Sequence, residues 1–345
     1  MNSSECRLIE ILQREGHANH SPITDKLFYI KSQEMIIYHL YLEMKLFLIP
    51  TSVCFVAAFF VTPSILFAIF SNVSLRRETR FLLLANALFS DFLYLLLFTT
   101  TSMFIVVNHK VPSYVCPVLL FLLAVNYCGG VQTALVMVAD TYLAVLWPLH
   151  YVRLLPSSRI KKLIALLWFS SCLFPAILFL TLYFTQEPGP CPLELCSLPV
   201  ILTITLHGND AIRLFHIFFI SAFLLCFSLV LCCYFFLCYK TRETGIWKSI
   251  LSRATATFLM HHAIFFSHFC PLLLLLIGSL LYINQVIDLE TVLCLNLIIC
   301  NVLIVLPKGV SPYLYGFRYR ELYRSLSLFC KLKHNSLVAP ENRVN

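Results

Sequence analysis

Two residues of opposite charge, Asp91 and Lys308, lie deep inside long apolar stretches of the sequence. An isolated charge at the centre of a bilayer costs roughly 2.5 to 3.5 kcal/mol, so we expect the two to neutralise each other as a buried ion pair. In the alternative, Lys308 reaches the membrane surface or loses its proton, and Asp91 is held by hydrogen bonds alone. A third possibility is that both groups belong to a transport or proton pathway.

A second acid, Asp140, ends another apolar stretch within the triplet Asp140-Thr141-Tyr142. An ionised carboxylate at the edge of a membrane requires a cation, a hydrogen-bond donor or water. We expect Arg153 or a nearby lysine to supply this partner. The alternative is an interfacial acid that cytoplasmic water solvates.

Three histidines, His261, His262 and His268, lie in one apolar stretch. His261 and His268 are seven residues apart, which places them on one face of a helix. A metal site would need further ligands of suitable geometry, so we predict no metal site. Instead, we expect His268 to hydrogen-bond across helices near a hinge at Pro271. The sequence shows no nucleophile and base in a convincing motif, which argues against an enzyme and gives no reason to expect a cofactor.

The composition explains where these residues must be placed. The chain has 345 residues, of which 59% are hydrophobic and 12% charged, with a mean hydropathy of +0.84. This is too apolar for one aqueous core, and each apolar stretch is long enough to cross about 30 Å of hydrocarbon as a helix. The predicted fold is an all-α membrane protein, a bundle of seven transmembrane helices near 46–70, 81–107, 115–147, 163–185, 214–239, 254–283 and 289–316.

Basic residues predict the orientation of this bundle. Seventeen lysines and arginines lie in the loops after the first, third and fifth stretches and in the tail, against seven on the other face. Since such residues are retained in the cytoplasm, residues 1–45 form an extracellular segment, 46–316 the bundle and 317–345 a cytoplasmic tail. The formal charge of +8 reports this orientation and does not indicate nucleic-acid binding. No cleavable signal is apparent, so the first stretch is expected to act as an uncleaved anchor.

The extracellular side carries candidate modification sites. Asn2 and Asn19 begin Asn-x-Ser sequons and are candidates for glycosylation. Most of the fifteen cysteines lie within or at the edges of the apolar stretches, where a thiol packs as a small apolar group. On the oxidising side, Cys116 is expected to form a disulfide with Cys191 or Cys196, and we prefer Cys196.

These features resemble the class A (rhodopsin-like) G-protein-coupled receptors from about residue 46 to 330. In that family an Asp-Arg-Tyr triplet ends the third span 24 residues after the disulfide cysteine, as Asp140-Thr141-Tyr142 follows Cys116 here. The following "YLAVLWPLHY" is similar to the second inner loop of olfactory-type receptors. The other matches are Asn86–Asp91 in span two, Trp168 in span four, "FFSHFCP" ending at Pro271 in span six, and Ser311-Pro312-Tyr313-Leu314-Tyr315 in span seven.

The departures from the family pattern are as informative as the matches. Thr141 replaces an arginine that, in the family, binds the neighbouring acid at rest and enters the G-protein cleft in the active state. His268 and Phe269 replace the cysteine and tryptophan of span six, and Ser311 replaces the asparagine of span seven. Cys226 stands in place of the proline of span five.

The resemblance also implies a sodium site, since the span-two acid of the family helps to hold a sodium ion. The corresponding positions here are Asp91, Gly130, Pro307, Lys308 and Ser311, so two supporting oxygen ligands are missing and an ammonium group is present. We therefore expect Lys308 to replace sodium as a built-in counter-ion.

The tail after Tyr315 has apolar residues at helical spacing and arginines at other positions. This pattern predicts a short amphipathic eighth helix along the inner leaflet, attracted to anionic membrane lipid. Cys330 in this segment is a candidate for palmitoylation, or it makes an unmodified apolar contact.

The resemblance implies a plasma-membrane receptor that passes the signal of an unknown extracellular ligand to a heterotrimeric G protein or arrestin, with coupling weakened by Thr141. Leu123 stands where amine receptors carry an acid, so a monoamine ligand is not expected. Candidate hinges are Pro271 and Pro312, and candidate switches are Tyr234, Phe265, Phe269 and Tyr315. One alternative is a non-signalling decoy or heteromer partner of the same fold. The other is a transporter that uses Asp91 and Lys308, although the sequence shows no internal repeat.

Overall fold

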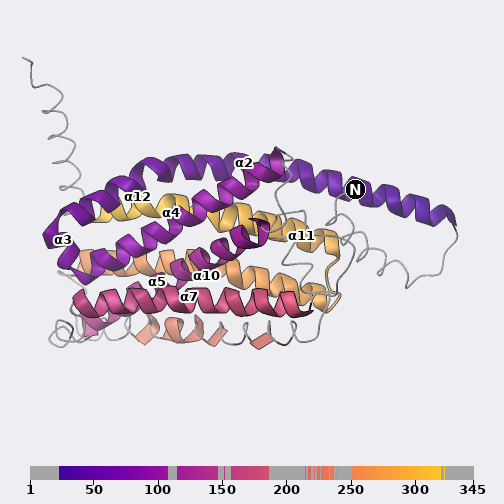
Figure 1. Cartoon of the computed structure of the whole chain (residues 1–345). Coiled ribbons are helices and arrows are strands. Elements are labelled where there is room, and N and C mark those ends of the chain that lie inside the picture. The colour runs from indigo at the N-terminus through magenta and orange to yellow at the C-terminus, as the bar shows by residue number, and fades with distance from the viewer. Residues whose placement is uncertain are drawn as a thin grey trace, which may run out of the picture.

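The protein forms a bundle of long helices that run side by side (Figure 1). The computed structural model describes residues 23–107, 115–146, 151, 157–185, 251–319 and 322, with scattered positions between 214 and 239. Across these ranges the regular structure is helical and contains no strand. The elements are α2 (Ile23–Ser71), α3 (Val73–Arg77), α4 (Thr79–Val106), α5 (Val115–Leu146), α7 (Ser157–Thr185), α10 (Leu251–Ile283), α11 (Leu289–Ile298), η2 (Ile299–Leu303) and α12 (Val305–Arg318).

Six segments of the described helices are long and apolar enough to cross a membrane. They are Lys45–Ser71, Thr79–Phe104, Val115–Ala144, Arg159–Ile177, Leu259–Tyr282 and Thr291–Arg318. Each coincides with one of the predicted apolar stretches, which confirms six of the seven as helices. The remaining stretch, 214–239, is described only at scattered positions and contains a shorter apolar helix at Phe227–Phe236.

The first helix is longer than the sequence predicts. α2 begins at Ile23 and runs for 49 residues, past the expected start of the span near residue 46. At 1.5 Å per residue, the 22 residues before Lys45 add about 33 Å of helix, and this part projects beyond the rest of the bundle in Figure 1. The predicted boundary at residue 45 therefore does not coincide with an end of the helix.

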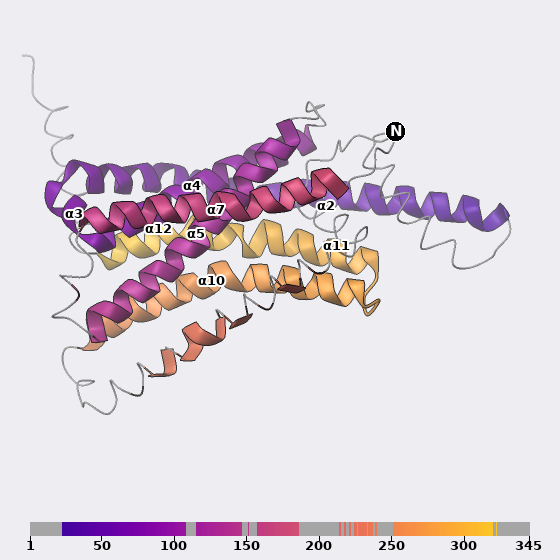
Figure 2. The ribbon, with the colours of Figure 1, turned by 60° about the horizontal axis from the view of Figure 1, so that its bottom comes forward.

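The contacts between helices show how the bundle closes. α4 packs against α2, α5, α7 and α12, while α10 packs against α5 and α12. α12 also packs against α2, so the last span closes onto the first. In Figure 2, α5 crosses the bundle obliquely, which brings it against both α4 and α10.

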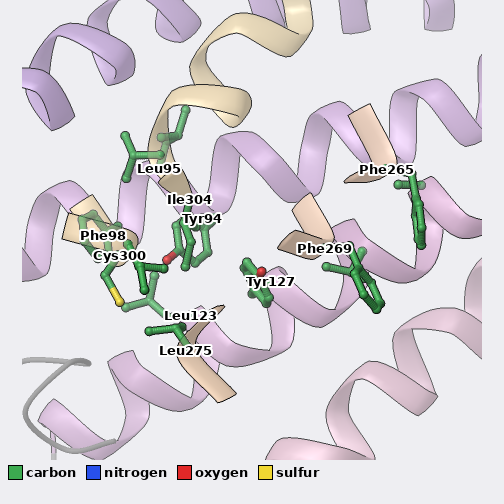
Figure 3. Close-up of a cluster of buried hydrophobic side chains, with 14 of the residues drawn as sticks. Tyr94, Leu95, Phe98, Leu123, Tyr127, Phe265, Phe269, Leu275, Cys300 and Ile304 are labelled. Carbon is green, nitrogen blue, oxygen red and sulfur yellow. The ribbon is translucent and has the colours of Figure 1, made fainter. Parts of the chain in front are cut away.

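Two apolar clusters fill the interior. The larger one includes Tyr94, Tyr127, Phe265 and Phe269, all at most 8% exposed (Figure 3). A second cluster surrounds Phe81, at the α3 end of α4, and includes Tyr315 and Tyr319. Lipid-facing positions on the same helices carry exposed apolar side chains such as Phe60 and Phe169, as expected for helices that lie in hydrocarbon.

The last span is interrupted by one wide turn. The amide of Ile304 donates to the carbonyl of Ile299 at 3.0 Å, which is the five-residue spacing of a π-helix. α12 follows and buries Lys308, Ser311, Pro312 and Tyr315 on its inner side.

The tail beyond this span is largely outside the described residues. α12 ends at Arg318, and the amide of Tyr319, its C-cap, donates to the carbonyl of Tyr315 at 3.1 Å. Beyond Tyr319 only Leu322 is described, and both residues are buried. The predicted amphipathic eighth helix therefore stays a prediction.

Candidate functional site

Asp91 of α4 and Lys308 of α12 meet in the middle of the bundle. Lys308 Nζ donates to Asp91 Oδ1 at 2.7 Å, and both residues are at most 3% exposed. The Lys308 side chain itself is fully buried, so in this structure it does not extend to the surface of the bundle. The two charges thus face each other directly.

Two aromatic rings also lie close to the Lys308 ammonium group. Nζ lies 4.8 Å from the centroid of the Tyr94 ring and 5.3 Å from that of Tyr127. The negative face of an aromatic ring attracts a cation, most strongly where water is excluded. An ammonium group has three N–H donors. The Asp91 carboxylate and these two rings therefore provide favourable surroundings without water.

The Asp91 carboxylate accepts further hydrogen bonds from two helices. His268 Nε2 of α10 lies 3.1 Å from Oδ1 and 3.3 Å from Oδ2, and Ser311 Oγ of α12 donates to Oδ2 at 3.1 Å. His268 Nδ1 lies 2.9 Å from the carbonyl oxygen of Ile264, one turn earlier in α10. His268 is 4% exposed. Asp91 therefore connects α4 to both α10 and α12.

Tyr127 extends this connection to a fourth helix. Its hydroxyl donates to the backbone carbonyl of His268 at 2.6 Å, which links α5 to α10 just before Pro271. We call Asp91, Lys308, His268, Ser311 and Tyr127 the ionic centre. These five residues join α4, α5, α10 and α12 through buried polar contacts.

The acid at the end of α5 has a different kind of partner. Asp140 is 8% exposed, and the hydroxyl of Tyr151 donates to its Oδ1 at 3.0 Å. The charge of Arg80 also acts on this carboxylate. Burial and, next, the Asp140 charge raise the pKa of Tyr151, so the phenol keeps its proton at neutral pH. The expected partner Arg153 lies outside the described residues.

The two residues after Asp140 point away from it in different ways. The hydroxyl of Thr141 donates to the carbonyl of Met137 at 2.8 Å, one turn back on its own helix. Tyr142 is buried, and its ring lies 6.0 Å from the ring of His262 on α10. Within the triplet, Tyr142 is therefore the residue that contacts α10. Thr141 makes no contact of the kind that a long charged side chain could make.

Comparison with known proteins places this arrangement in a family. The family model of the 7 transmembrane receptor (rhodopsin family) matches residues 63–315 of this chain. The chain belongs to the rhodopsin family of seven-transmembrane receptors. The human protein named "Probable G-protein coupled receptor 148" is 28% identical over 278 residues, which cover 79% of this chain and 79% of that protein. The receptor is therefore a multi-pass protein of the plasma membrane.

The residues around Asp91 in this receptor do not suit a sodium ion. Lys308 Nζ occupies one side of the carboxylate, and His268 and Ser311 occupy both of its oxygens. Gly130 has no side chain to supply a ligand atom, and a Cβ there would already lie 3.3 Å from Asp91 Oδ1 and 3.4 Å from Lys308 Nζ. A second cation beside the ammonium group would also be repelled.

The predicted switch residues of the receptor form two groups. Phe265 and Phe269 of α10 lie in the larger apolar cluster with ring centroids 5.3 Å apart, and Phe227 stacks on Phe269 at 5.2 Å (Figure 3). Tyr234 and Tyr315 lie against adjacent histidines of α10, with centroids 5.3 Å from His262 and 6.1 Å from His261, respectively.

A second polar network supports the receptor beside the ionic centre. Trp168 Nε1 of α7 donates to Asn86 Oδ1 at 2.9 Å, and Asn86 Nδ2 donates to Thr133 Oγ1 of α5 at 2.8 Å. Ser90, one turn after Asn86, donates to the carbonyl of Asn126 at 2.6 Å. These bonds fix α4 against α5 and α7, the neighbours that help to set the orientation of Asp91.

Several predicted sites lie outside the described residues. Cys116, the second residue of α5, is disulfide-bonded, but both expected partners, Cys191 and Cys196, are among the residues that the structure does not describe. The same holds for the sequons at Asn2 and Asn19 and for Cys330. Among the described residues no group of three or more metal-binding side chains comes together.

Sequence reasoning missed three contacts of the receptor. His268 was expected to bond across helices, but nothing in the sequence indicated Asp91 as its partner. Tyr151 was not considered as the donor to Asp140, although a tyrosine 11 residues beyond the acid was a visible signal. The bond between His261 Nε2 and the hydroxyl of Tyr319, 3.1 Å long, was also missed.

Proposed function

We propose that this receptor transmits the signal of an extracellular ligand to heterotrimeric G proteins or arrestin on the cytoplasmic side, with its amino terminus outside. The observation that carries the proposal is the ionic centre, which connects α4 to α10 and α12. These two helices contain Pro271 and Pro312, where helices bend most readily. A ligand that favours one arrangement of these helices would shift the population of the whole bundle.

We propose further that coupling is weak, because Thr141 is too short to reach a G protein. Its hydroxyl is bonded to Met137 on the same helix, and Asp140 takes its hydrogen bond from Tyr151. An arginine at residue 141 would restore a long, permanently charged fork at this end of α5. We expect the Thr141→Arg variant to activate G proteins more strongly than the parent protein does.

The test is basal nucleotide exchange on a panel of purified G proteins, with parent and variants reconstituted at equal density in nanodiscs. We expect exchange slightly above empty nanodiscs for the parent and at least threefold higher for Thr141→Arg. Thr141→Gln is the matched control, because it adds length and polarity without charge, and it should behave as the parent does. Exchange at the level of empty nanodiscs for all three proteins would refute the signalling proposal.

The second candidate function is a non-signalling receptor that captures ligand or pairs with another receptor. The geometry of Thr141 favours it, since the triplet presents no cation toward the centre of the bundle. In the same experiment, this candidate predicts no exchange in the parent and a gain only in Thr141→Arg. A measurable signal from the parent would exclude it.

We also propose that Lys308 serves as the built-in counter-ion of Asp91 in place of sodium. Its support is the 2.7 Å contact and the two tyrosine rings around the ammonium group. An ion that is part of the chain cannot dissociate, so the receptor should be indifferent to sodium concentration. Sodium-dependent stability of the parent protein would contradict this proposal.

Three covalent modifications complete the proposal. We propose glycans at Asn2 and Asn19, a disulfide from Cys116 to Cys196 or Cys191, and palmitate at Cys330. A mobility shift on deglycosylation tests the first, and non-reducing peptide mapping tests the second. For the third, Cys330→Ser should abolish incorporation of labelled palmitate, and unchanged labelling would exclude this site.

A further inference from the structure

Two adjacent histidines of α10 contact different helices near the α3 end of the bundle. His261 and His262 are 6% and 3% exposed, in a segment that is otherwise mostly apolar. Neighbouring residues on an α-helix point about 100° apart, so the two rings meet different helices. Buried polar side chains in a membrane bundle are costly unless they contact other polar or aromatic groups.

His261 connects α10 to the end of the last span. Its Nε2 lies 3.1 Å from the hydroxyl of Tyr319, and its ring centroid lies 6.1 Å from that of Tyr315. The ring of Tyr319 in turn packs edge-on against Phe81 of α4 at 5.4 Å. Through one hydrogen bond and these rings, α10 is held to both α12 and α4.

His262 connects α10 to the fifth apolar stretch and to α5. Its ring centroid lies 5.3 Å from that of Tyr234, in the fifth apolar stretch, and 6.0 Å from that of Tyr142 on α5. Both distances fall in the range in which aromatic pairs attract each other beyond simple burial. Tyr142 directly follows Thr141, so these rings lie at the same end of α5 as the Asp140-Thr141-Tyr142 triplet.

We infer that His261, His262, Tyr319, Tyr142 and Tyr234 form an aromatic latch that holds the α3 end of α10 closed. Thr141 bonds back to Met137 and provides no link to α10. The latch supplies that link through the ring of Tyr142, which lies 6.0 Å from the ring of His262 on α10. The inference goes beyond the proposed function, because it assigns the closed state to residues outside the ionic centre, of which only Tyr142 belongs to the Asp-Thr-Tyr triplet.

The latch lies far enough along α10 from Pro271 that a small bend at the proline displaces it. His261 is ten residues before Pro271 in α10, or about 15 Å along the helix axis. A bend of about 10° at the proline would move this end of α10 by roughly 2.5 Å, which is enough to break a hydrogen bond of 3.1 Å. Opening of α10 at this hinge therefore requires the latch to separate.

The test measures the distance between α3 and α10 by double electron–electron resonance in lipid nanodiscs. Spin labels are introduced through noncanonical amino acids at Arg76 and Leu259, which are both exposed, because the chain contains fifteen cysteines. The parent should populate mainly the short distance. His261→Phe and Tyr319→Phe, which each remove one partner of the bond, should each raise the ratio of long to short distances at least threefold.

Three further variants make the result specific. The double variant His261→Phe, Tyr319→Phe should match the larger single effect, because both changes remove the same bond. Tyr313→Phe is the matched control: it deletes another hydroxyl of α12, which donates to the carbonyl of Ala57 at 2.8 Å, and it should leave the distances unchanged. His262→Ala should raise the ratio further when added to His261→Phe, since it removes the contacts on the other side.

An unchanged distance distribution in both His261→Phe and Tyr319→Phe would overturn the inference. An equal shift in Tyr313→Phe, or multiplicative effects in the double variant, would overturn it as well. Tyr319→Phe removes a single oxygen atom, so it keeps the test valid if a histidine variant fails to fold. The distance measurement uses no G protein. An exchange assay without signal would therefore refute the signalling proposal and leave the latch inference unaffected.

Discussion

The ion pair between Asp91 and Lys308 makes a quantitative prediction about stability. Lys308→Met keeps most of the length of the side chain but removes the ammonium group, which leaves a buried carboxylate with His268 and Ser311 as its remaining donors. Asp91→Asn leaves the ammonium group facing two rings and a neutral amide. Breaking one partner of a buried pair costs about 3–5 kcal/mol, because the other charge stays without compensation.

The two single changes should differ in size. After Lys308→Met, the remaining donors at Asp91 still stabilise the carboxylate, so we expect a loss near the lower end, about 3 kcal/mol. After Asp91→Asn, each remaining contact of the ammonium group with a ring is worth roughly 2 kcal/mol when water is excluded, which only partly offsets the loss of the carboxylate. The double variant carries no uncompensated charge and should lose less than either single variant.

The assay is thermal unfolding of the four proteins in nanodiscs, arranged as a double-mutant cycle. Ser267→Ala is the control for a substitution in α10 that leaves the ion pair intact, since this hydroxyl bonds to the carbonyl of Ile264, one turn back on its own helix. Repeating the cycle in sodium and in potassium chloride separates a fixed counter-ion from a bound one. Additive losses in the cycle, or stabilisation by sodium in the parent protein, would refute the reasoning.

Two other changes test close contacts elsewhere in the receptor. Gly309→Ala would place a Cβ 2.8 Å from Cys54 Cβ, so α12 must move away from α2, and the free energy of unfolding should fall by about 1–3 kcal/mol. Gly316→Ala should be tolerated, because its Cβ would lie 3.7 Å from the nearest side chain. Equal melting temperatures for the two alanine variants would contradict this packing. Tyr151→Phe removes the hydroxyl that donates to Asp140 and should lower the free energy of unfolding by about 1–3 kcal/mol. Because the pKa of Tyr151 is raised, its phenol loses its proton only in strong alkali. The stability lost in Tyr151→Phe should therefore be constant from about pH 6 to 9, and a loss that vanished toward pH 9 would contradict this.

Most helices of the bundle could be predicted from the sequence because hydrocarbon offers the backbone no hydrogen-bond partners. Long apolar stretches must be helices in a bilayer, and six of them lie in helices whose last residues are within a few positions of the expected ends. The beginning of α2 was not predictable in this way, because the polar and mixed residues before Lys45 carry no membrane signal. A helix that continues out of the membrane depends on local propensity, which is a weaker indicator.

The same distinction holds for the candidate site. Asp91 and Lys308 were singled out because a charge in hydrocarbon has few possible partners, and the structure places them in contact. The contact of His268 with Asp91 joins residues 177 positions apart and depends on how far α10 is rotated about its axis. Burial alone does not set that rotation, since several histidine orientations would hide the ring equally well. The latch contacts of His261 and His262 were not predictable for the same reason.

The wide turn at Ile299–Leu303 has a consequence for the spacing of the last span. A π-turn contains one residue more than an α-turn, and each residue of an α-helix advances the direction of side chains by about 100°. The wide turn absorbs this extra residue, so the segment after it keeps its facing direction. If the same residues formed regular α-helix, everything after Leu303 would rotate by about 100°, and Lys308 would be carried away from Asp91. The ammonium group reaches its carboxylate because the wide turn accommodates one residue more than a regular turn would.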